Sequence, residues 1–310
     1  AAALAVTYLG FSAATVAYQA WGAEIAGDSS LRTRLTAARE GFWLLGVVLA
    51  AALPAIIAGS LSEGIERLSW ILPPLLLIAA ITSFAGVGTG GGTARVPSGE
   101  ALWPSLRQLL ADVAFRRLLL VFVANGISAA LPATLFLFFV ADVLHGETAS
   151  GALLAVYFVA GAASLPFWLK LAARHGRVTA WLAAMGLATP AFAGASLLGS
   201  GDLWPFALIC IASGLALGAD LALPAAIAAD LGQRRQQSGA CFGVWNFVAK
   251  LNLALAAGLA LPLLGALGYV PGGMAGLGAL TFTYALLPLA FKLLAATLLW
   301  RWRDSLEIRS

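Results

Sequence analysis

Residues 203–230 read LWPFALICIASGLALGADLALPAAIAAD and contain two charged residues, Asp220 and Asp230. An α-helix rises about 1.5 Å per residue, so roughly 20 apolar residues cross the ~30 Å hydrocarbon core of a bilayer. This stretch is therefore long and apolar enough to form a transmembrane helix. Comparable apolar runs lie on both sides of it along the chain.

The composition agrees with a membrane-embedded chain. Of the 310 residues, 61% are hydrophobic and 10% are charged, and the mean hydropathy is +0.92. Backbone groups that face lipid need internal hydrogen-bond partners, which favours helices over open strands and loops. We predict an all-α membrane protein, a helical bundle with about nine transmembrane helices. The predicted spans are Ala2–Ala26, Glu40–Ser60, Leu68–Val87, Leu118–Leu144, Ser150–Leu169, Val178–Leu198, Leu203–Asp230, Gly239–Gly268 and Gly276–Trp300.

The loops between these spans alternate in charge. Arginines follow the first span, Glu63 and Glu66 follow the second, and the alternation continues to the end of the chain. Because basic loops stay in the cytoplasm, we predict a cytoplasmic C-terminus and an external first residue. This orientation explains the net charge of +4 better than nucleic-acid binding does. The basic loops carry Arg32, Arg34 and Arg39; Arg95, Arg107, Arg116 and Arg117; Lys170, Arg174 and Arg177; Arg234 and Arg235; and Arg301, Arg303 and Arg309.

The longest loop, from Gly86 to Arg117, divides the chain. It is rich in glycine and then polar, with glycines at 88, 90, 91 and 92, which predicts a cytoplasmic linker. We assign 1–87 to the last three of six helices of an N-terminal half, 88–117 to the linker and 118–310 to a C-terminal six-helix half. The sequence opens within an apolar run without a basic leader, so we expect further spans before it.

An internal repeat supports this division. A shift of 202 positions places residues of the first spans on residues of the last spans without inverting their membrane orientation. Such a parallel repeat is the relation between the two halves of major-facilitator transporters, and predicts roughly twelve spans in the intact protein. The shift places Ala23, Ile25, Ala26, Asp28, Arg32, Ala38, Gly41, Trp43, Ala52 and Leu53 on Ala225, Ile227, Ala228, Asp230, Arg234, Ala240, Gly243, Trp245, Ala254 and Leu255.

Six groups of segments along nearly the whole chain form a recognisable pattern. They are Tyr18–Glu24 with Asp28, Arg32–Leu35 and Arg39; Asn125–Gly126 with Pro132–Leu135; Leu165–Trp168; Gly218–Leu221 to Asp230; Trp245 to Lys250; and Gly268–Pro271. In this order, the segments resemble the glycoside-pentoside-hexuronide:cation symporters, the melibiose-permease-like branch of the major facilitator superfamily. The resemblance implies symport of a sugar, glycoside or related small solute with a cation, by alternating access between two six-helix halves in the bacterial inner membrane.

Two charged residues lie deep within predicted spans. Lys250 and Asp220 are each roughly 15 Å from the cytoplasmic end of consecutive spans, where a charge needs a partner or a water-filled cavity. We predict that they form an ion pair, either a fixed structural bridge or a pair that rearranges with substrate or proton. Lys292 is expected to reach toward the inner interface or another helix and is not assigned to the site. In the family that the chain resembles, the lysine that matches Lys250 belongs to the region that binds the sugar and the cation.

Polar groups nearby complete the candidate pathway. Asn246 lies one helical turn before Lys250 and shares its face. Aromatic and amide side chains suit sugars, which offer apolar ring faces and hydroxyl groups. Asn252 and the Gly214–Gly218 step are expected to serve helix packing. The predicted substrate and ion pathway is Tyr18, Gln19, Asn125, Asp220, Asn246 and Lys250.

Charges repeat in the two cytoplasmic loops related by the 202-residue shift. Positive-inside anchoring explains the arginines alone, but the repeated aspartates also favour ion pairs that hold the cytoplasmic side closed and separate when the cavity opens inward. The predicted gate is Asp28, Arg32, Arg34, Arg39, Asp230 and Arg234.

Other functions remain open at this point. An uncoupled or exporting carrier of solutes or lipids has the same sequence pattern, and so does a noncatalytic sensor or assembly subunit. A membrane enzyme is not favoured, because His145 and His175 fall in loops on opposite sides and no metal-ligand spacing occurs. We therefore expect no catalytic residues, no metal and no cofactor.

The intact protein is expected not to depend strongly on sodium, and either to use a proton as the coupling ion or to move solute without ion coupling. Alignment from Asp28 places Thr15 where the resemblance expects an acidic cation ligand. Sodium is a hard cation that favours several oxygen ligands, and a hydroxyl brings no full negative charge. Asp220 is one candidate for the titrating group.

Single-cysteine labelling tests the topology. Cysteines at positions 34, 174 and 235 should react from the cytoplasmic side of sealed vesicles, and those at 63 and 147 from the outer side, because basic loops are retained inside. Reaction of positions 34 and 63 from the same side would contradict the predicted orientation.

Overall fold

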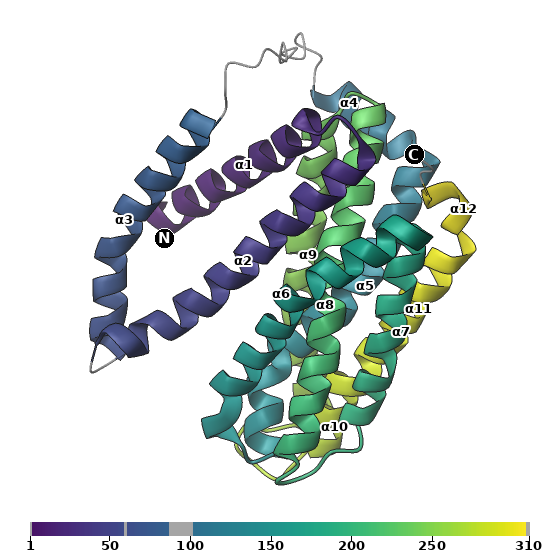
Figure 1. The fold of residues 1–310 in the computed structure, drawn as a ribbon. Helices are drawn as coiled ribbons and strands as arrows, with labels where there is room; N and C mark the ends of the chain where they lie inside the picture. Colours follow the sequence, from purple (N-terminus) through teal and green to yellow (C-terminus); the bar gives the residue numbers. More distant parts are fainter. Residues whose placement is uncertain (1, 59–60, 87–101, 308–310) are drawn as a thin grey trace.

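The structure is a computed structural model that describes residues 2–58, 61–86 and 102–307. All regular elements in these ranges are helices (Figure 1). The predicted fold class is confirmed. The helices are α1 (Ala2–Ile25), α2 (Ser29–Ile57), α3 (Leu61–Gly86), α4 (Leu102–Ala111), α5 (Val113–Phe138), η1 (Phe139–Val143), η2 (Glu147–Ala149), α6 (Ser150–His175), α7 (Arg177–Ala195), α8 (Leu203–Arg234), α9 (Ser238–Ala266), α10 (Leu277–Thr281), η3 (Phe282–Leu286), α11 (Leu287–Arg301) and α12 (Arg303–Leu306).

Seven helical rods in the described part of the chain are long and apolar enough to cross a membrane. The first two predicted spans correspond to α1 and α2, which are 24 and 29 residues long but are not among those seven. The seven spans are Glu63–Ser83, Val113–Val143, Glu147–His175, Arg177–Ala195, Leu203–Arg234, Ser238–Ala266 and Leu277–Arg301.

Helix α2 begins earlier than predicted. The Asp28 side chain accepts a hydrogen bond from the backbone N–H of Leu31 at 2.7 Å and caps the helix, so α2 begins at Ser29 rather than Glu40. Arg32, Arg34 and Arg39 therefore lie on a helix and not in a loop, which corrects the prediction. A short polar Asp-Ser-Ser start is a typical N-terminal helix signal.

The predicted linker is partly helical. Its glycine-rich part and Arg95 lie outside the described residues, but α4 occupies Leu102–Ala111 and contacts α5 and α9. Asp112 then caps α5 and binds Arg235 at the end of α8, at 2.6 Å. Burial alone raises the pKa of Asp112, but hydrogen bonds from the Phe115 N–H, Arg235 and the Ala114 N–H outweigh it and hold this pKa below its ordinary value.

Helices α5 to α11 form one bundle, and α1 and α2 lie against one side of it (Figure 1). The bundle end that carries Arg32, Arg177, Arg235 and Arg301 is called the basic end below. The buried core near this end includes Ala20 and Ala23 of α1. The core at the opposite end draws all its members from residues 130–285.

The two N-terminal helices separate from the bundle away from the basic end. Leu9 and Phe11 in the first half of α1, and Leu45 and Leu49 beyond the middle of α2, are exposed. Figure 1 shows α1 and α2 diverging from α8 and α9 in that direction, with α3 beyond them. Contact between α1–α2 and the bundle is therefore concentrated at the basic end.

Glycines bring α6 and α8 into close contact. A Cβ atom at Gly214 would collide with the carbonyl of Tyr157 and lie 3.0 Å from the Cβ of Ala160. A Cβ at Gly218 would collide with the hydroxyl of Ser164. In lipid, where helix association depends on van der Waals packing, small residues allow this approach. The predicted packing role of the Gly214–Gly218 step is confirmed.

Replacing Gly214 with leucine should separate α6 from α8. Overpacking of this kind typically costs about 1–3 kcal/mol, so the variant should unfold at a clearly lower temperature in detergent. Gly186→Leu is the matched control, because a Cβ at Gly186 meets nothing within 4 Å. Equal melting temperatures for the two variants would contradict the close contact.

Candidate transport pathway and gate

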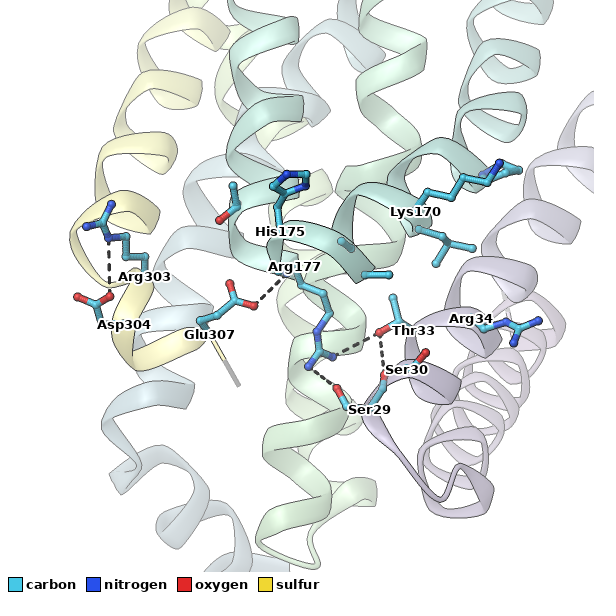
Figure 2. Close-up of a pocket in the computed structure, with 16 residues that line it drawn as sticks. Ser29, Ser30, Thr33, Arg34, Lys170, His175, Arg177, Arg303, Asp304 and Glu307 are labelled. Carbon is cyan, nitrogen blue, oxygen red and sulfur yellow. Dashed lines mark hydrogen bonds and ion pairs between the residues drawn. The ribbon is translucent and has the colours of Figure 1, made fainter. Parts of the chain in front are cut away.

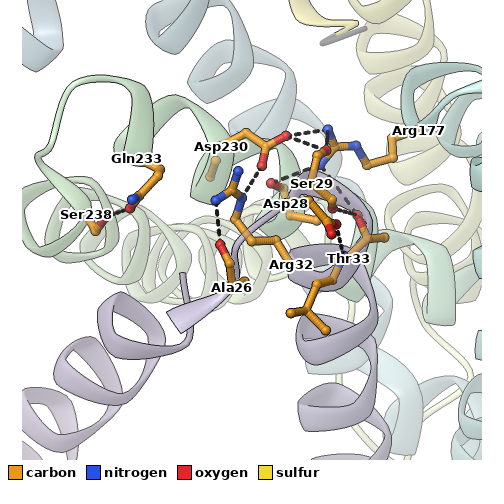
Figure 3. A network of polar contacts seen from close by, with 12 residues as sticks. Ala26, Asp28, Ser29, Arg32, Thr33, Arg177, Asp230, Gln233 and Ser238 are labelled. Atoms are coloured by element: carbon orange, nitrogen blue, oxygen red, sulfur yellow. Dashed lines mark hydrogen bonds and ion pairs between the residues drawn. The ribbon is translucent and has the colours of Figure 1, made fainter. Parts of the chain in front are cut away.

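Asp230 is the centre of a polar network at the basic end (Figure 3). It lies in the last turns of α8 with 2% of its surface exposed. Its carboxylate accepts hydrogen bonds from Arg32 Nε at 2.6 Å, from the Ser29 hydroxyl at 2.9 Å and from the Arg177 guanidinium. A buried carboxylate is costly unless charge and hydrogen bonds satisfy it, and here two arginines do so.

The network joins α2 to α7 and α8. Ser29 and Arg32 stand in the first turn of α2 because the Asp28 cap turns the chain there. Arg32 also donates to the carbonyl of Ala26 at 3.0 Å, which ties it to the turn between α1 and α2. The Asp230 carboxylate therefore connects the start of α2, and the turn between α1 and α2, to the bundle.

Arg177 reaches this network from the start of α7. The Glu307 carboxylate accepts hydrogen bonds from the backbone N–H groups of Arg177 and Val178, each at 3.0 Å, and so caps α7 (Figure 2). Gly176, at φ +89°, precedes Arg177, and a Cβ there would lie 2.5 Å from Glu307 Oε1. Only glycine fits this close approach without displacing the carboxylate.

The predicted gate is corrected in part. Arg32 and Asp230 meet as the prediction requires. Asp28 caps α2 instead, Arg39 pairs with Glu40 at 2.6 Å, and Arg34 is exposed beside a cavity. Arg234 is exposed and has no hydrogen-bond or ion-pair partner among residues 2–58, 61–86 and 102–307.

The sequence repeat does not carry over to the contacts. Asp28 ends a turn and caps a helix, whereas Asp230 lies inside α8 because that helix continues to Arg234. A capping carboxylate is directed at backbone N–H groups, while one within the helix projects towards neighbouring helices. The two aspartates that the repeat makes equivalent therefore have different roles: Asp28 caps a helix, and Asp230 binds arginines of neighbouring helices.

A second polar contact joins α1 to α9 nearer the middle of the bundle. Asn246 Nδ2 donates to Gln19 Oε1 at 2.5 Å, and one turn further along α9 Lys250 Nζ donates to the Ser12 hydroxyl. Gln19, Asn246 and Lys250 were predicted pathway residues, and the structure places them together on this seam. Tyr18 stays 52% exposed.

Asp220 pairs with Lys292 and not with Lys250, so the predicted pairing is wrong. Lys292 Nζ lies 2.8 Å from Asp220 Oδ2 and donates to Asn125 Oδ1 at 2.7 Å. Trp181 Nε1 donates to Asp220 Oδ1 at 2.8 Å. Similar depth on two neighbouring spans was not enough to bring Asp220 to Lys250, because Lys250 faces α1 while Asp220 faces α7 and α11.

The candidate pathway thus divides into two groups. Gln19, Asn246 and Lys250 lie between the N-terminal helices and the bundle. Asn125 and Asp220 lie inside the bundle, in a cluster that joins α5, α7, α8 and α11.

Residues 1–303 match the family described as MFS/sugar transport protein. The chain belongs to this family. A crystal structure of a bacterial homologue of the iron transporter ferroportin in an outward-facing state has the same fold, with a TM-score of 0.57 and 18% sequence identity. The alignment covers 91% of this chain and 66%, just under two thirds, of that chain. No curated protein matches this sequence.

Membership of this family, together with the seven apolar helices, indicates a multi-pass membrane protein. The structure places three residues in the polar networks that were not predicted for the pathway or the gate: Arg177, Lys292 and Trp181. Lys292 carried a usable signal, because an ionisable residue within a transmembrane segment normally has a partner inside the bundle. The sequence signal for Arg177 was weaker: it is a basic residue directly after Gly176, between two predicted spans.

Neutralising the pair inside the bundle tests its coupling. Asp220→Asn or Lys292→Met alone leaves an unpaired buried charge, and each should destabilise the MFS bundle by about 3–5 kcal/mol. The double variant should recover part of that loss, measured as melting temperature in detergent. Asp220→Asn combined with Lys250→Met is the control and should show additive losses. Additive losses in the Asp220–Lys292 cycle would contradict a direct pair.

Proposed function

We propose that this chain forms part of a secondary active transporter that moves a sugar, glycoside or related small solute across the bacterial inner membrane by alternating access. The network around Asp230 is the observation that carries the proposal, because it joins α2 to α7 and α8 at the basic end. Residues 1–87 are the last three helices of one half, and 118–310 form the other half. The basic end is cytoplasmic.

The exposed surfaces support a closed cytoplasmic gate. Core packing between α1–α2 and the bundle is found near the basic end, while Leu9, Phe11 and Leu45 are exposed further away. Closure at one end with separation at the other is the arrangement that alternating access requires before the gate opens.

The gate can open without leaving Asp230 unpaired. If α2 moves away, Asp230 loses Arg32 and Ser29, but it keeps Arg177, which lies in the same half. A carboxylate stripped of every partner would impose a large penalty on the open state. Because Asp230 pairs with Arg32 only in the closed state but with Arg177 in both, the closed and open states stay close in free energy, as a transport cycle requires.

The seam between α1 and α9 supplies the solute contacts. Gln19 and Asn246 carry amide donors and acceptors, and Lys250 adds a cation with one hydroxyl partner, Ser12. These groups lie between the two halves, where a solute exchanges its hydration for protein hydrogen bonds. When no solute is bound they satisfy one another.

Arg32→Gln should weaken the gate. Loss of a charge-assisted hydrogen bond of about 1.5–3 kcal/mol shifts the closed-to-open ratio by about tenfold or more. Spin labels at Leu31 and Arg174, measured by double electron–electron resonance, should then show a longer-distance population, and net uptake should fall. Arg234→Gln is the matched control, since it removes an exposed arginine at the equivalent repeat position. Identical distance distributions for the two variants would sink the gate assignment.

The coupling ion in this proposal is a proton and not sodium. Thr15, at the position where an acidic ligand is expected, donates its hydroxyl to the carbonyl of Phe11 at 2.7 Å and brings no negative charge. Uptake by the intact protein should therefore change little when a sodium gradient is imposed at fixed pH, and it should respond to a pH gradient. A severalfold stimulation by sodium would contradict this expectation.

A further inference from the structure

A cavity of about 1070 Å³ opens at the basic end beside the Asp230 network (Figure 2). Its walls come from the start of α2, the end of α6, the start of α7 and the segment of α12 with Glu307. It is separate from the seam between α1 and α9, where we place the transported solute.

The charges in this cavity do not balance. Asp304 pairs with Arg303 at 3.7 Å, whereas Glu307 accepts hydrogen bonds from neutral backbone N–H groups of α7 and contributes one negative charge. Arg34 and Lys170 also line the cavity, both exposed, and neither has an ion-pair or hydrogen-bond partner within the described ranges. The cavity therefore keeps an excess of positive charge suited to an anion.

The wall of the cavity formed by α6 is largely apolar. Pro166, Leu169 and Ala173 of α6 line it, on a helix within the candidate membrane span Glu147–His175. Lys170 lies among them, so a cation and an apolar surface meet at the end of a membrane span. Contact with this apolar wall does not stabilise a bound soluble anion. A phospholipid, in contrast, presents an anionic headgroup and an acyl chain together.

We propose that this cavity binds the headgroup of an anionic phospholipid, with Arg34 and Lys170 as its charge partners and the α6 wall beside its acyl chain. Basic pockets between helices at the cytoplasmic side are suited to such headgroups. Arg34 lies on α2 and Lys170 on α6, so a headgroup bound by both side chains joins the two helices next to Ser29 and Arg177. Such a lipid favours the closed state of the gate.

The test measures lipid binding and needs no transport. The intact protein in detergent is titrated with phosphatidylglycerol, with phosphatidylcholine and with inorganic phosphate, and bound lipid is counted by native mass spectrometry. Phosphatidylglycerol should bind in preference to phosphatidylcholine. The Arg34→Gln/Lys170→Gln variant should weaken its binding by about 25-fold, given roughly fivefold per cation near a membrane surface.

The matched control is Arg107→Gln/Arg116→Gln, which removes two exposed arginines predicted to lie at the same membrane face but outside the cavity. It should bind phosphatidylglycerol as the unmodified protein does. Equal weakening in both double variants would mean that general surface charge attracts the lipid, and would overturn the site. Equal affinity for the two lipids would also overturn it. Phosphate that displaces phosphatidylglycerol at comparable concentration would indicate a soluble-anion site instead.

Melting temperatures of both variants without added lipid give a check on folding. A fall confined to Arg34→Gln/Lys170→Gln in the absence of lipid would mean that these side chains stabilise the protein directly, and would contradict a lipid role. Failure of the transport proposal would leave the binding result unaffected, because the readout is bound lipid.

Discussion

A charge buried in a helical bundle within lipid has to be paired there, because neither water nor the hydrocarbon compensates it. This constraint explains where the structure places its ionisable groups. Lys292, with 1% of its surface exposed, lies between Asp220 and Asn125. Asp230 lies between Arg32 and Arg177. Each pairing ties together helices that are distant in the sequence, so satisfying the charges also sets which helices are neighbours.

The two clusters differ in what they connect. The Asp220 cluster lies wholly inside the bundle of α5 to α11. The Asp230 cluster includes Ser29 and Arg32 of α2, so it is complete only when α2 is in contact with the bundle. A buried ion pair within one body specifies its packing, whereas one shared between two bodies is suited to a gate. Similar ion pairs therefore hold the bundle together in one place and connect the N-terminal helices to it in another.

Small residues set how closely several of these helices approach. Gly214 and Gly218 let the backbones of α6 and α8 approach closely, and Gly176 lets the Glu307 carboxylate approach the start of α7. A larger side chain at any of these positions would displace a carbonyl, a hydroxyl or a carboxylate. The packing of α8 and the start of α7, which carry Asp230 and Arg177, therefore depends in part on glycines.

The sequence alone determined that the chain is a bundle of membrane-spanning helices, since the length of an apolar run and the need to satisfy the backbone are local properties. It also grouped Arg32 with Asp230, and Gln19 with Asn246 and Lys250, from charge, polarity and position along the span, and the structure brings each group together. The partner of Asp220 could be identified only from the tertiary structure. Asp220 and Lys292 are 72 residues apart along the chain, and the faces that their helices present to each other are set by the packing of α7, α8 and α11. Depth in the membrane follows from residue number, but the direction of a side chain around the bundle depends on how the helices are rotated and packed, and only the tertiary structure decides that.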